Sequence, residues 1–522
     1  MQALIQAVAT PHSPESLAGL LAGEPGLVLL RSAMVGGAQS RYSFVAARPF
    51  LTFRSFGSRC EIHSPVAADA NPRPRCQRSG FTPLPIHTGG YATFGNPWHL
   101  LDELMGRYEL LEEVDLPFPL GGCFGFWGYD LKNFAEPKLP RRAIQDLGLP
   151  ECHVGFYDSL VAFDHHLGKT WVVSAGLRAD GSRSERRAWG GLAFWQRLLA
   201  EACGQRASVL EYGNPLALCP SHPHRGSDVV SSNLSRVEFL ARVELAQRYI
   251  RAGDIYQVNL SQRLAALWPT SSWKLFEQLS AVSPAPFAAF LDCGEFQLAS
   301  SSPELFLRLS GKHVITRPIK GTRPRAADAN EDARLSHELQ TSAKENAELV
   351  MITDLLRNDL GRVCEYGSVR VPDLTRLERY PQVQHLVSTV EGDLRPDVTH
   401  LDALAACFPG GSITGAPKFR AMEIIDELEP TARGPFTGAL GCLGFNRESQ
   451  LSIIIRTAIC QAGTAYFPVG AGIVADSQPE AEYEETLAKA AGFLAALHPR
   501  EARATQTGPA PIKSSAAGNP QP

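Results

Sequence analysis

The sequence lacks several features that would assign it to common protein classes. Its eleven cysteines include no Cys-x-x-Cys pair, which argues against a zinc ribbon or a dithiol redox site and favours reduced, packed thiols. No apolar run approaches the roughly 18 residues that span a bilayer. No basic residue precedes Arg31, so a secretory signal is not expected. We therefore expect a cytoplasmic protein that does not insert into membranes.

Charge of one sign is not in excess either. The 50 Lys and Arg residues are opposed by 54 Asp and Glu residues, which gives a formal net charge of −4. Such a balance provides no basic field for nucleic acid or for an anionic membrane surface. We expect neither to be a partner.

The composition is that of a globular protein large enough for several cores, with 522 residues of which 44% are hydrophobic. Changes in composition and in predicted secondary structure divide the sequence into four parts. We expect a β-rich N-terminal half over 1–203, a linker over 204–232, a dense helix-and-strand domain over 233–498 and a disordered tail over 499–522.

Two predicted helices each carry two glutamates three residues apart, at the border of their apolar face. The pairs are Glu345 and Glu348 in a helix expected over 336–358, and Glu482 and Glu485 in a helix expected over 479–497. Carboxylates beside an apolar face are costly unless a cation meets them. The pairs could converge on one hard divalent cation such as Mg²⁺, or they could be solvated faces with internal ion pairs.

Glycine-rich segments and one arginine indicate an anion site. Residues 408–418 precede a helix, and residues 469–474 are expected to form a second loop; loops of this kind free backbone N–H groups. Between them, an apolar strand expected over 451–458 is interrupted by Arg456. A buried arginine needs either a carboxylate ligand or an internal salt bridge. A phosphate-binding loop is not predicted, because Gly-Lys-Ser/Thr is absent.

Lys320 and Glu304 lie about one hairpin apart in the sequence. A desolvated lysine can act as a nucleophile, and a nearby carboxyl can serve as a general acid. The alternative is surface charge on a hairpin.

Taken together, these segments resemble the chorismate-utilising enzymes, a family that includes anthranilate synthase component I, aminodeoxychorismate synthase component I and the isochorismate and salicylate synthases. The likeness is dense over 235–495 and thinner in the N-terminal half, where it rests on Leu29–Ser32, Ser40–Ser43 and Gly121–Tyr129. It implies an α+β fold in which antiparallel β-sheets pack face to face with helices outside, as in anthranilate synthase component I, and in which the two sequence halves are woven together.

The resemblance also implies roles for individual residues. Glu345, Glu348, Glu482 and Glu485 would surround Mg²⁺, with Glu348 and Glu485 as direct ligands. Arg456, Gly470, Gly472, Lys489, Thr414, Gly415, His385 and Gln257 would line the chorismate pocket. Glu304 would protonate the departing 4-hydroxyl group.

Two positions separate the subfamilies. Isochorismate and salicylate synthases carry a lysine base where this chain has Gln257, so addition of water is disfavoured. Anthranilate synthases read Pro-Ile-Ala-Gly-Thr where this chain has Lys320, and a lysine there resembles the aminodeoxychorismate enzymes. The implied reaction is attack of Lys320 on C2 of chorismate followed by amination at C4.

The resemblance implies a separate glutamine amidotransferase partner, because no glutaminase signature is present in the chain. The alternatives are anthranilate synthase component I, with amination at C2, and an amino-acid-sensing protein without activity on the same fold. Relatives hold an amino acid between their halves, and Ser32, Pro284 and Phe287 match that region. Tryptophan is a candidate occupant, but Arg31 stands where the family has an acidic residue, so feedback by tryptophan is not predicted.

Overall fold

The computed structural model describes residues 2–32, 41–64, 84–86, 90–111, 116–201, 230–380 and 383–497. Most of the predicted linker and all of the predicted tail lie outside the described residues.

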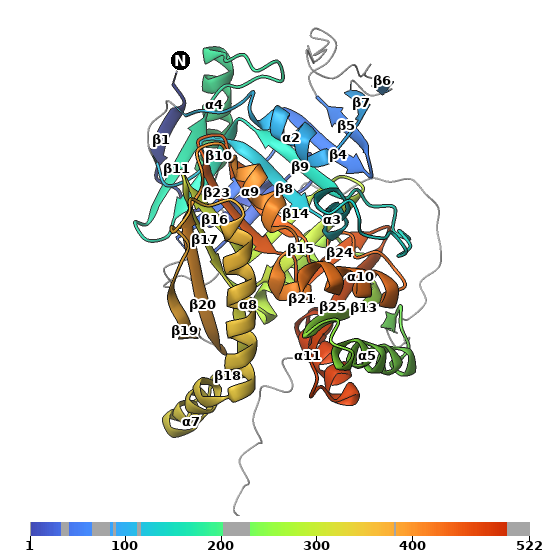
Figure 1. Ribbon diagram of the computed structural model, residues 1–522. Coiled ribbons are helices and arrows are strands. Elements are labelled where there is room, and N and C mark those ends of the chain that lie inside the picture. The colour runs from blue at the N-terminus through green and yellow to red at the C-terminus, as the bar shows by residue number, and fades with distance from the viewer. Residues whose placement is uncertain are drawn as a thin grey trace, which may run out of the picture.

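Two large antiparallel sheets form the framework of the described chain (Figure 1). The first, of 12 described strands, contains β1 (Leu4–Val8), β2 (Val28–Arg31), β3 (Tyr42–Ala46), β10 (Ser159–Asp164), β11 (Lys169–Ser174), β12 (Ser231–Ser232), β13 (Gln257–Leu267), β14 (Phe287–Asp292), β15 (Phe296–Ser302), β21 (Gly415–Ala416), β24 (Thr457–Gln461) and β25 (Thr464–Ile473). The second, of 13 described strands, contains β4 (Leu51–Phe56), β5 (Arg59–His63), β6 (Leu84–Ile86), β7 (Gly90–Phe94), β8 (Gly122–Trp127), β9 (Cys152–Tyr157), β16 (Leu305–Ser310), β17 (His313–Arg317), β18 (Ile319–Pro324), β19 (Arg370–Arg379), β20 (Val383–Asp393), β22 (Ala439–Gly444) and β23 (Glu448–Ile453).

The sheets pack face to face because alternate residues of a strand point to opposite sides. In β14, Ala289 and Leu291 belong to the core between the sheets, whereas Ala288 and Phe290 belong to a second core under the helices. The strand is therefore buried on both faces, which explains its continuous apolar sequence.

The helices cover the outer faces and the ends of the sheets (Figure 1). They are α1 (Pro14–Leu20), α2 (Pro97–Met105), α3 (Lys132–Ala135), α4 (Glu185–Ala200), α5 (Arg236–Arg251), α6 (Ser272–Val282), α7 (Ala329–Thr341), α8 (Ala343–Gly361), α9 (His400–Cys407), α10 (Lys418–Leu428) and α11 (Pro479–Leu497), with short 3₁₀ turns at Tyr129–Leu131 and Gly411–Ile413. Helices α1, α4, α6 and α11 share one core with the first sheet, and α5 and α10 form another against β13 and β25.

Both sheets contain strands from both halves of the sequence. In the first sheet, β2 pairs with β14, and in the second, β8 pairs with β22. The halves are thus woven together, as the family resemblance implies. The predicted α+β architecture with face-to-face antiparallel sheets is confirmed.

Several local predictions need correction. The helix expected over 336–358 is two helices, because Ser342 caps the start of α8. The strand expected over 451–458 is split between β23 and β24, which belong to different sheets. The loop expected over 469–474 is the end of strand β25, paired with β13. The helix expected over 479–497 is α11, with the bounds predicted.

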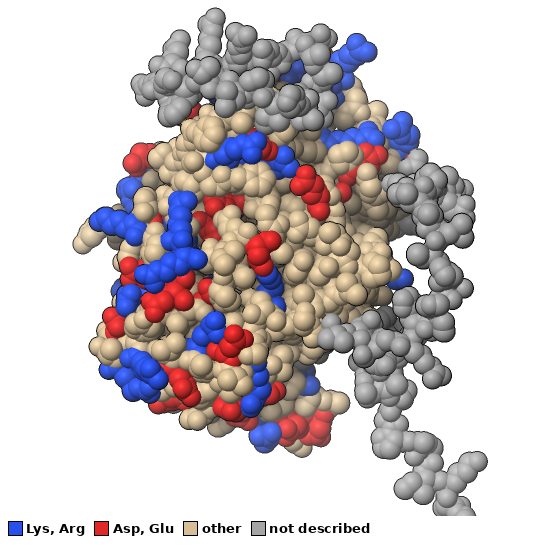
Figure 2. All heavy atoms as spheres, turned by 90° about the vertical axis from the view of Figure 1, so that its right-hand side faces the viewer, with Lys and Arg blue, Asp and Glu red and all other residues tan. Residues whose placement is uncertain are grey.

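Acidic and basic side chains are interspersed on the face shown in Figure 2, which also has a broad area without either. In the described part of the chain, no helix is both long enough and apolar enough to cross a membrane.

Two glycines face each other where β8 and β22 pair. Gly125 and Gly441 are register partners, and both have φ of 157°. A Cβ on Gly125 would overlap the carbonyl oxygen of His153, and one on Gly441 would overlap that of Gln450. The close approach of four neighbouring strands, β9, β8, β22 and β23, therefore requires glycine at both positions.

We expect Gly441→Ala to lower the free energy of unfolding by about 2–4 kcal/mol, since the added methyl group must displace backbone and sits at an unfavourable φ. Denaturant unfolding of the purified variant measures this. The matched control is Gly190→Ala in α4, where a Cβ meets no atom within 4 Å; it should leave stability unchanged or raise it by up to about 1 kcal/mol. Equal effects of the two substitutions would contradict this explanation.

Candidate active site

A cavity of about 610 Å³ opens between α8, α11 and the ends of both sheets. Predicted site residues from seven separate segments line it: Glu304, Lys320, Glu345, Glu348, His385, Arg456, Gly470, Gly472, Glu485 and Lys489. Segments far apart in the sequence therefore bring acidic, basic and glycine residues to one place.

The acidic residues approach the cavity from two helices. Glu345 lies in the first turn of α8, where the Ser342 hydroxyl accepts a hydrogen bond from its backbone N–H at 3.4 Å. Burial, and then the neighbouring Glu348, raise the pKa of Glu345. On α11, burial likewise raises the pKa of Glu482, with a further contribution from Glu485. Each helix thus holds two carboxylates close together in a partly desolvated place.

Basic and hydroxyl groups partner all four carboxylates in this structure. Glu348 pairs with Lys320 at 3.4 Å, Glu345 with Arg323 at 3.7 Å and Glu485 with Lys489 at 2.7 Å, and Glu482 accepts a hydrogen bond from Ser477 at 2.6 Å. Although burial opposes it, Lys489, Lys320 and Lys344 together lower the pKa of Glu485. The charges of the cavity are therefore balanced internally.

A hard divalent cation fits this donor set. The donors are carboxylate oxygens alone, which is what Mg²⁺ prefers. Burial raises the pKa of Glu345 and of Glu482, and in each case a neighbouring glutamate adds a repulsion that a cation would relieve. Within the ranges that the structure describes, no three His, Cys, Asp or Glu side chains are close enough together to form a metal cluster. Magnesium binding at these glutamates stays a prediction.

Strand β18 carries Lys320 into the cavity beside a bulge. The register of β18 against β20 shifts between Lys320 and Thr322, where Gly321 has φ of 67°. A bulge re-aims the neighbouring side chain. A Cβ placed on Gly472 would lie 3.8 Å from Lys320 Nζ and 2.9 Å from Gln257 Nε2, so the small residue in β25 allows the amine and the amide to lie side by side.

Glu304 is a buried carboxyl among cations. Burial raises its pKa to about 7, although a hydrogen bond with Ser412 and the charges of Lys320, Lys489 and Arg456 act in the opposite direction. Only 7% of the residue is exposed. Near neutral pH this carboxyl can therefore hold a proton, which is the state that a general acid needs.

Arg456 lies where the chain passes from one sheet to the other. Strand β23 ends in the second sheet and β24 begins in the first, and Arg456 between them has φ of 50°. Its backbone carbonyl accepts a hydrogen bond from Ser301 N–H, but no described residue hydrogen bonds to its guanidinium. Burial lowers its pKa, while Glu304 acts against this. The guanidinium is thus available for an anionic ligand.

Lys489 and His385 add a basic group and a neutral polar group to the wall of the cavity. Lys489 Nζ donates to the carbonyl oxygen of Gly470 at 2.8 Å. Burial, and then Arg456, lower the pKa of His385 to about 4, so its imidazole is neutral at physiological pH. It lies 2.9 Å from the hydroxyl oxygen of Thr322.

Four predicted residues lie behind the cavity wall rather than on it: Gln257, Thr414, Gly415 and Glu482. The hydroxyl of Thr414 donates to the carbonyl of Gly410 at 3.0 Å, and Gly415 pairs with Val258 as β21 joins β13. Both polar side-chain atoms of Gln257, Nε2 and Oε1, are buried without a hydrogen-bond partner among the described residues. Gln257 therefore has polar atoms available for a ligand.

Comparisons with known proteins agree with this arrangement. Residues 86–495 match the family model described as chorismate binding enzyme. The chain belongs to this family. It is 38% identical to anthranilate synthase component 1 of Acetivibrio thermocellus over 90% of this chain and 89% of the relative, and 38% identical to aminodeoxychorismate synthase component 1 of Escherichia coli K12 over 91% and 93%.

Among solved structures, anthranilate synthase component I from Streptococcus pneumoniae TIGR4 superposes with a TM-score of 0.70 at 30% identity, covering 88% of this chain and 94% of that one. This chorismate-utilising enzyme therefore has the anthranilate synthase component I-like fold. The relatives carry two different names, so the similarity leaves open which product the enzyme makes.

The sequence interpretation missed several residues of this chorismate-binding enzyme. Ser412 contacts Glu304 from the glycine-rich segment, and Lys344 lies between the two acidic pairs. Asn259 lines the cavity; its position two residues after Gln257 on a strand could have indicated it, since such residues share a face.

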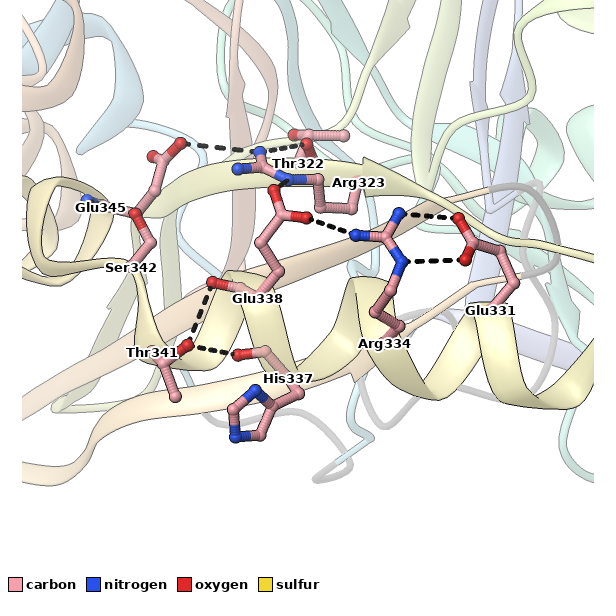
Figure 3. A network of polar contacts seen from close by, with 9 residues as sticks. All are labelled: Thr322, Arg323, Glu331, Arg334, His337, Glu338, Thr341, Ser342 and Glu345. Atoms are coloured by element: carbon pink, nitrogen blue, oxygen red, sulfur yellow. Dashed lines mark hydrogen bonds and ion pairs between the residues drawn. The ribbon is translucent and has the colours of Figure 1, made fainter.

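Arg323 was also missed, and it links the site to α7 (Figure 3). Its guanidinium contacts Glu338 at 3.0 Å as well as Glu345 at 3.7 Å. Glu338 in turn pairs with Arg334 at 3.3 Å, and Arg334 with Glu331 at 2.7 Å. A chain of alternating charges thus runs along α7 to the first turn of α8.

A second, smaller cavity lies between the sheets, away from the first. Ser32 and Phe287 line it, as do Tyr42 and Arg31, whereas Pro284 does not. The hydroxyl oxygen of Ser32 is buried there with no hydrogen-bond partner among the described residues. Occupation by an amino acid stays a prediction.

The raised pKa of Glu304 has a consequence for stability. A carboxyl whose pKa rises on folding favours the folded state below its unfolded pKa, near 4.5, and this contribution is lost as the pH rises to about 7. We expect the stability of Glu304→Gln relative to the parent protein to increase by about 2–3 kcal/mol between pH 5 and pH 8. Denaturant unfolding at both pH values measures it. The exposed Glu295→Gln control should show no such change, and a pH-independent difference for Glu304→Gln would disprove the assignment.

Proposed function

We propose that this enzyme aminates chorismate at C4 to give 4-amino-4-deoxychorismate, the precursor of para-aminobenzoate in folate biosynthesis. The observation that carries the proposal is Lys320: its primary amine lies in the family's cavity, beside Gln257 and in contact with Glu348. The similarity to aminodeoxychorismate synthase component 1 of Escherichia coli supports it.

The cavity suits a ring that carries two carboxylates. The free guanidinium of Arg456 and the ammonium group of Lys489 provide cationic partners for carboxylates. Glu348, Glu485, Glu345 and Glu482 would hold Mg²⁺, which when bound supplies a positive charge for the ring carboxylate of chorismate. Glycines 470 and 472 keep the wall of β25 close to the ring.

The chain's own groups account for the reaction steps. Lys320 Nζ attacks C2 of the ring, the double bonds shift, and the C4–oxygen bond breaks while Glu304 donates its proton to the departing hydroxyl group. Ammonia then adds at C4, the double bonds shift back, and the C2–nitrogen bond to Lys320 breaks. Water forms in the first half of this sequence, and the lysine is regenerated in the second.

Lys320 must lose a proton before it attacks. Glu348 Oε2 at 3.4 Å is a carboxylate within reach to receive that proton. The neutral imidazole of His385, fixed by Thr322, adds no positive charge near this amine. The arrangement therefore supports a nucleophilic role for the lysine.

Ammonia must come from another protein, because the sequence carries no glutaminase signature. We infer that a glutamine amidotransferase subunit provides it. We also infer that the second cavity, with Ser32 and Phe287 in its wall, accepts a free amino acid, for which tryptophan is one candidate.

Anthranilate synthase is the second candidate, favoured by the similarity to the Acetivibrio and Streptococcus proteins. It would aminate C2 and release pyruvate. Lys320 favours the C4 product because a nucleophile bonded to C2 blocks that carbon and directs ammonia to C4.

Product analysis separates the candidates. With chorismate, Mg²⁺ and an ammonium salt, we expect a product with the mass of aminodeoxychorismate and no release of pyruvate, measured by mass spectrometry and a coupled pyruvate assay. Omission of Mg²⁺ should abolish the product. Anthranilate together with stoichiometric pyruvate would refute C4 amination while keeping the enzyme in the family.

The role of Lys320 can be tested separately. We expect Lys320→Ala to lower C4 amination on the order of 10³-fold, as for loss of a group that acts in the transition state, and to shift the remaining product toward the 2-amino isomer. Lys320→Arg keeps the charge beside Glu348 without a nucleophile and should be equally impaired. Lys274→Ala, on the remote helix α6, is the control. C4 amination at the original rate in Lys320→Ala would rule out this role.

A further inference from the structure

Two small cavities lie behind the active-site cavity. The outer one is lined by the segment 145–151 together with Asp130 and Arg263, and the inner one by Ser261 and Glu429. Their free spaces are about 20 Å³ and about 10 Å³. Such a space accommodates a single molecule of the size of water or ammonia.

The three cavities share walls in series. Arg263, Ala432 and Arg433 line both the outer and the inner cavity. Phe436 and Pro468 line both the inner cavity and the active-site cavity. A molecule that passes Ala432 from the outer cavity therefore enters the inner cavity. The opposite wall of the inner cavity also lines the active-site cavity.

Buried acceptors without partners mark both ends of this series. Glu151, only 5% exposed, lines the outer cavity, and its Oε2 has no hydrogen-bond partner among the described residues. Asn259 Oδ1, also without such a partner, lines the active-site cavity. Each oxygen can accept a hydrogen bond from the N–H of a small ligand, and leaving it without one is costly.

Arg433 gives the shared wall a fixed position. Glu429 holds its guanidinium through two hydrogen bonds of 2.8 and 2.7 Å. The same group donates to the Ile413 carbonyl at 3.1 Å and to the Thr437 hydroxyl at 3.2 Å, and both of these residues line the active-site cavity. Because Glu429 neutralises it, this guanidinium is a fixed part of the wall between the inner cavity and the active-site cavity.

The outer cavity lies at the molecular surface. Its lining residues Gln145, Asp146 and Gly148 are exposed, and Asp146 forms an ion pair with Arg263 beside it. Ile144, next to them, is 67% exposed. Helices α3 and α10 lie on the right-hand side of Figure 1, the side that Figure 2 shows with its broad uncharged area.

We propose that the two small cavities form the route by which neutral ammonia reaches the active site, entering beside Asp146 and passing Ala432 to arrive at Asn259. The proposal rests on the proposed amination, and it places the amidotransferase subunit over the outer cavity. Direct entry from bulk solvent through the open side of the large cavity would remain the path of ammonia added as a salt.

The test narrows the route at Ala432, which lines both small cavities and is not part of the active-site cavity. In the complex with the amidotransferase subunit, Ala432→Phe should lower glutamine-dependent amination roughly tenfold, equivalent to about 1.4 kcal/mol. Amination with ammonium chloride, release of glutamate from glutamine and co-elution of the two subunits should all be unchanged. Ala179→Phe, at a half-buried loop alanine that lines none of these cavities, should alter none of the four measurements.

The outcomes distinguish the route from the reaction. Equal losses with glutamine and with ammonium chloride, or no loss with glutamine, would overturn the route, as would the absence of glutamine-dependent activity with any amidotransferase subunit. Ala432→Leu repeats the comparison with a smaller side chain if the phenylalanine variant does not fold. The ammonium-dependent product, assayed without the partner, tests the amination itself.

Discussion

The balance of charge inside one partly desolvated cavity is the constraint on which the rest of the site depends. Four carboxylates from two helices meet lysine and arginine side chains from β18, α8 and α11, and Arg456 in the β23–β24 connection acts on Glu304. None of these charges could be buried alone. Each segment therefore needs the others in place, and the network through Arg323 extends this requirement to α7 (Figure 3).

The woven sheets supply the rigidity that this balance requires. Because each sheet takes strands from both halves of the sequence, the strands that end at the cavity cannot move apart without opening the core between the sheets. Departures from regular structure occur where a functional side chain must be aimed. Gly321 forms the bulge beside Lys320, and Arg456 adopts a positive φ where the chain changes sheets.

The sequence predicts those parts of this arrangement that depend on local signals. Helix α11 was predicted within its bounds because Pro479 begins it and its apolar stripe is regular. The single helix expected over 336–358 was wrong because the apolar periodicity continues across Ser342, although Thr341-Ser342-x-x-Glu345 contains a helix-start signal. Residues 469–474 were taken for a loop because Gly470 and Gly472 are weak strand formers; pairing with β13 overrides that propensity.

The features that depend on long-range contacts could not be predicted from the sequence. A largely apolar run conceals the change of sheet before Arg456, because successive residues are buried at the end of β23 and along most of β24. The partners of the carboxylates depend equally on tertiary packing: Glu348 meets Lys320 from 28 positions away. The residue types at the site were readable from the sequence with the help of the family resemblance, but their pairing was not.

The same charge balance explains how one scaffold can serve relatives with different products. The chain is 38% identical to a relative named for each activity. An alanine at position 320 would remove the only described partner that Glu348 has in an ion pair. In the proposed reaction, a substitution at this position would therefore alter the charge balance of the acidic cluster as well as remove the amine.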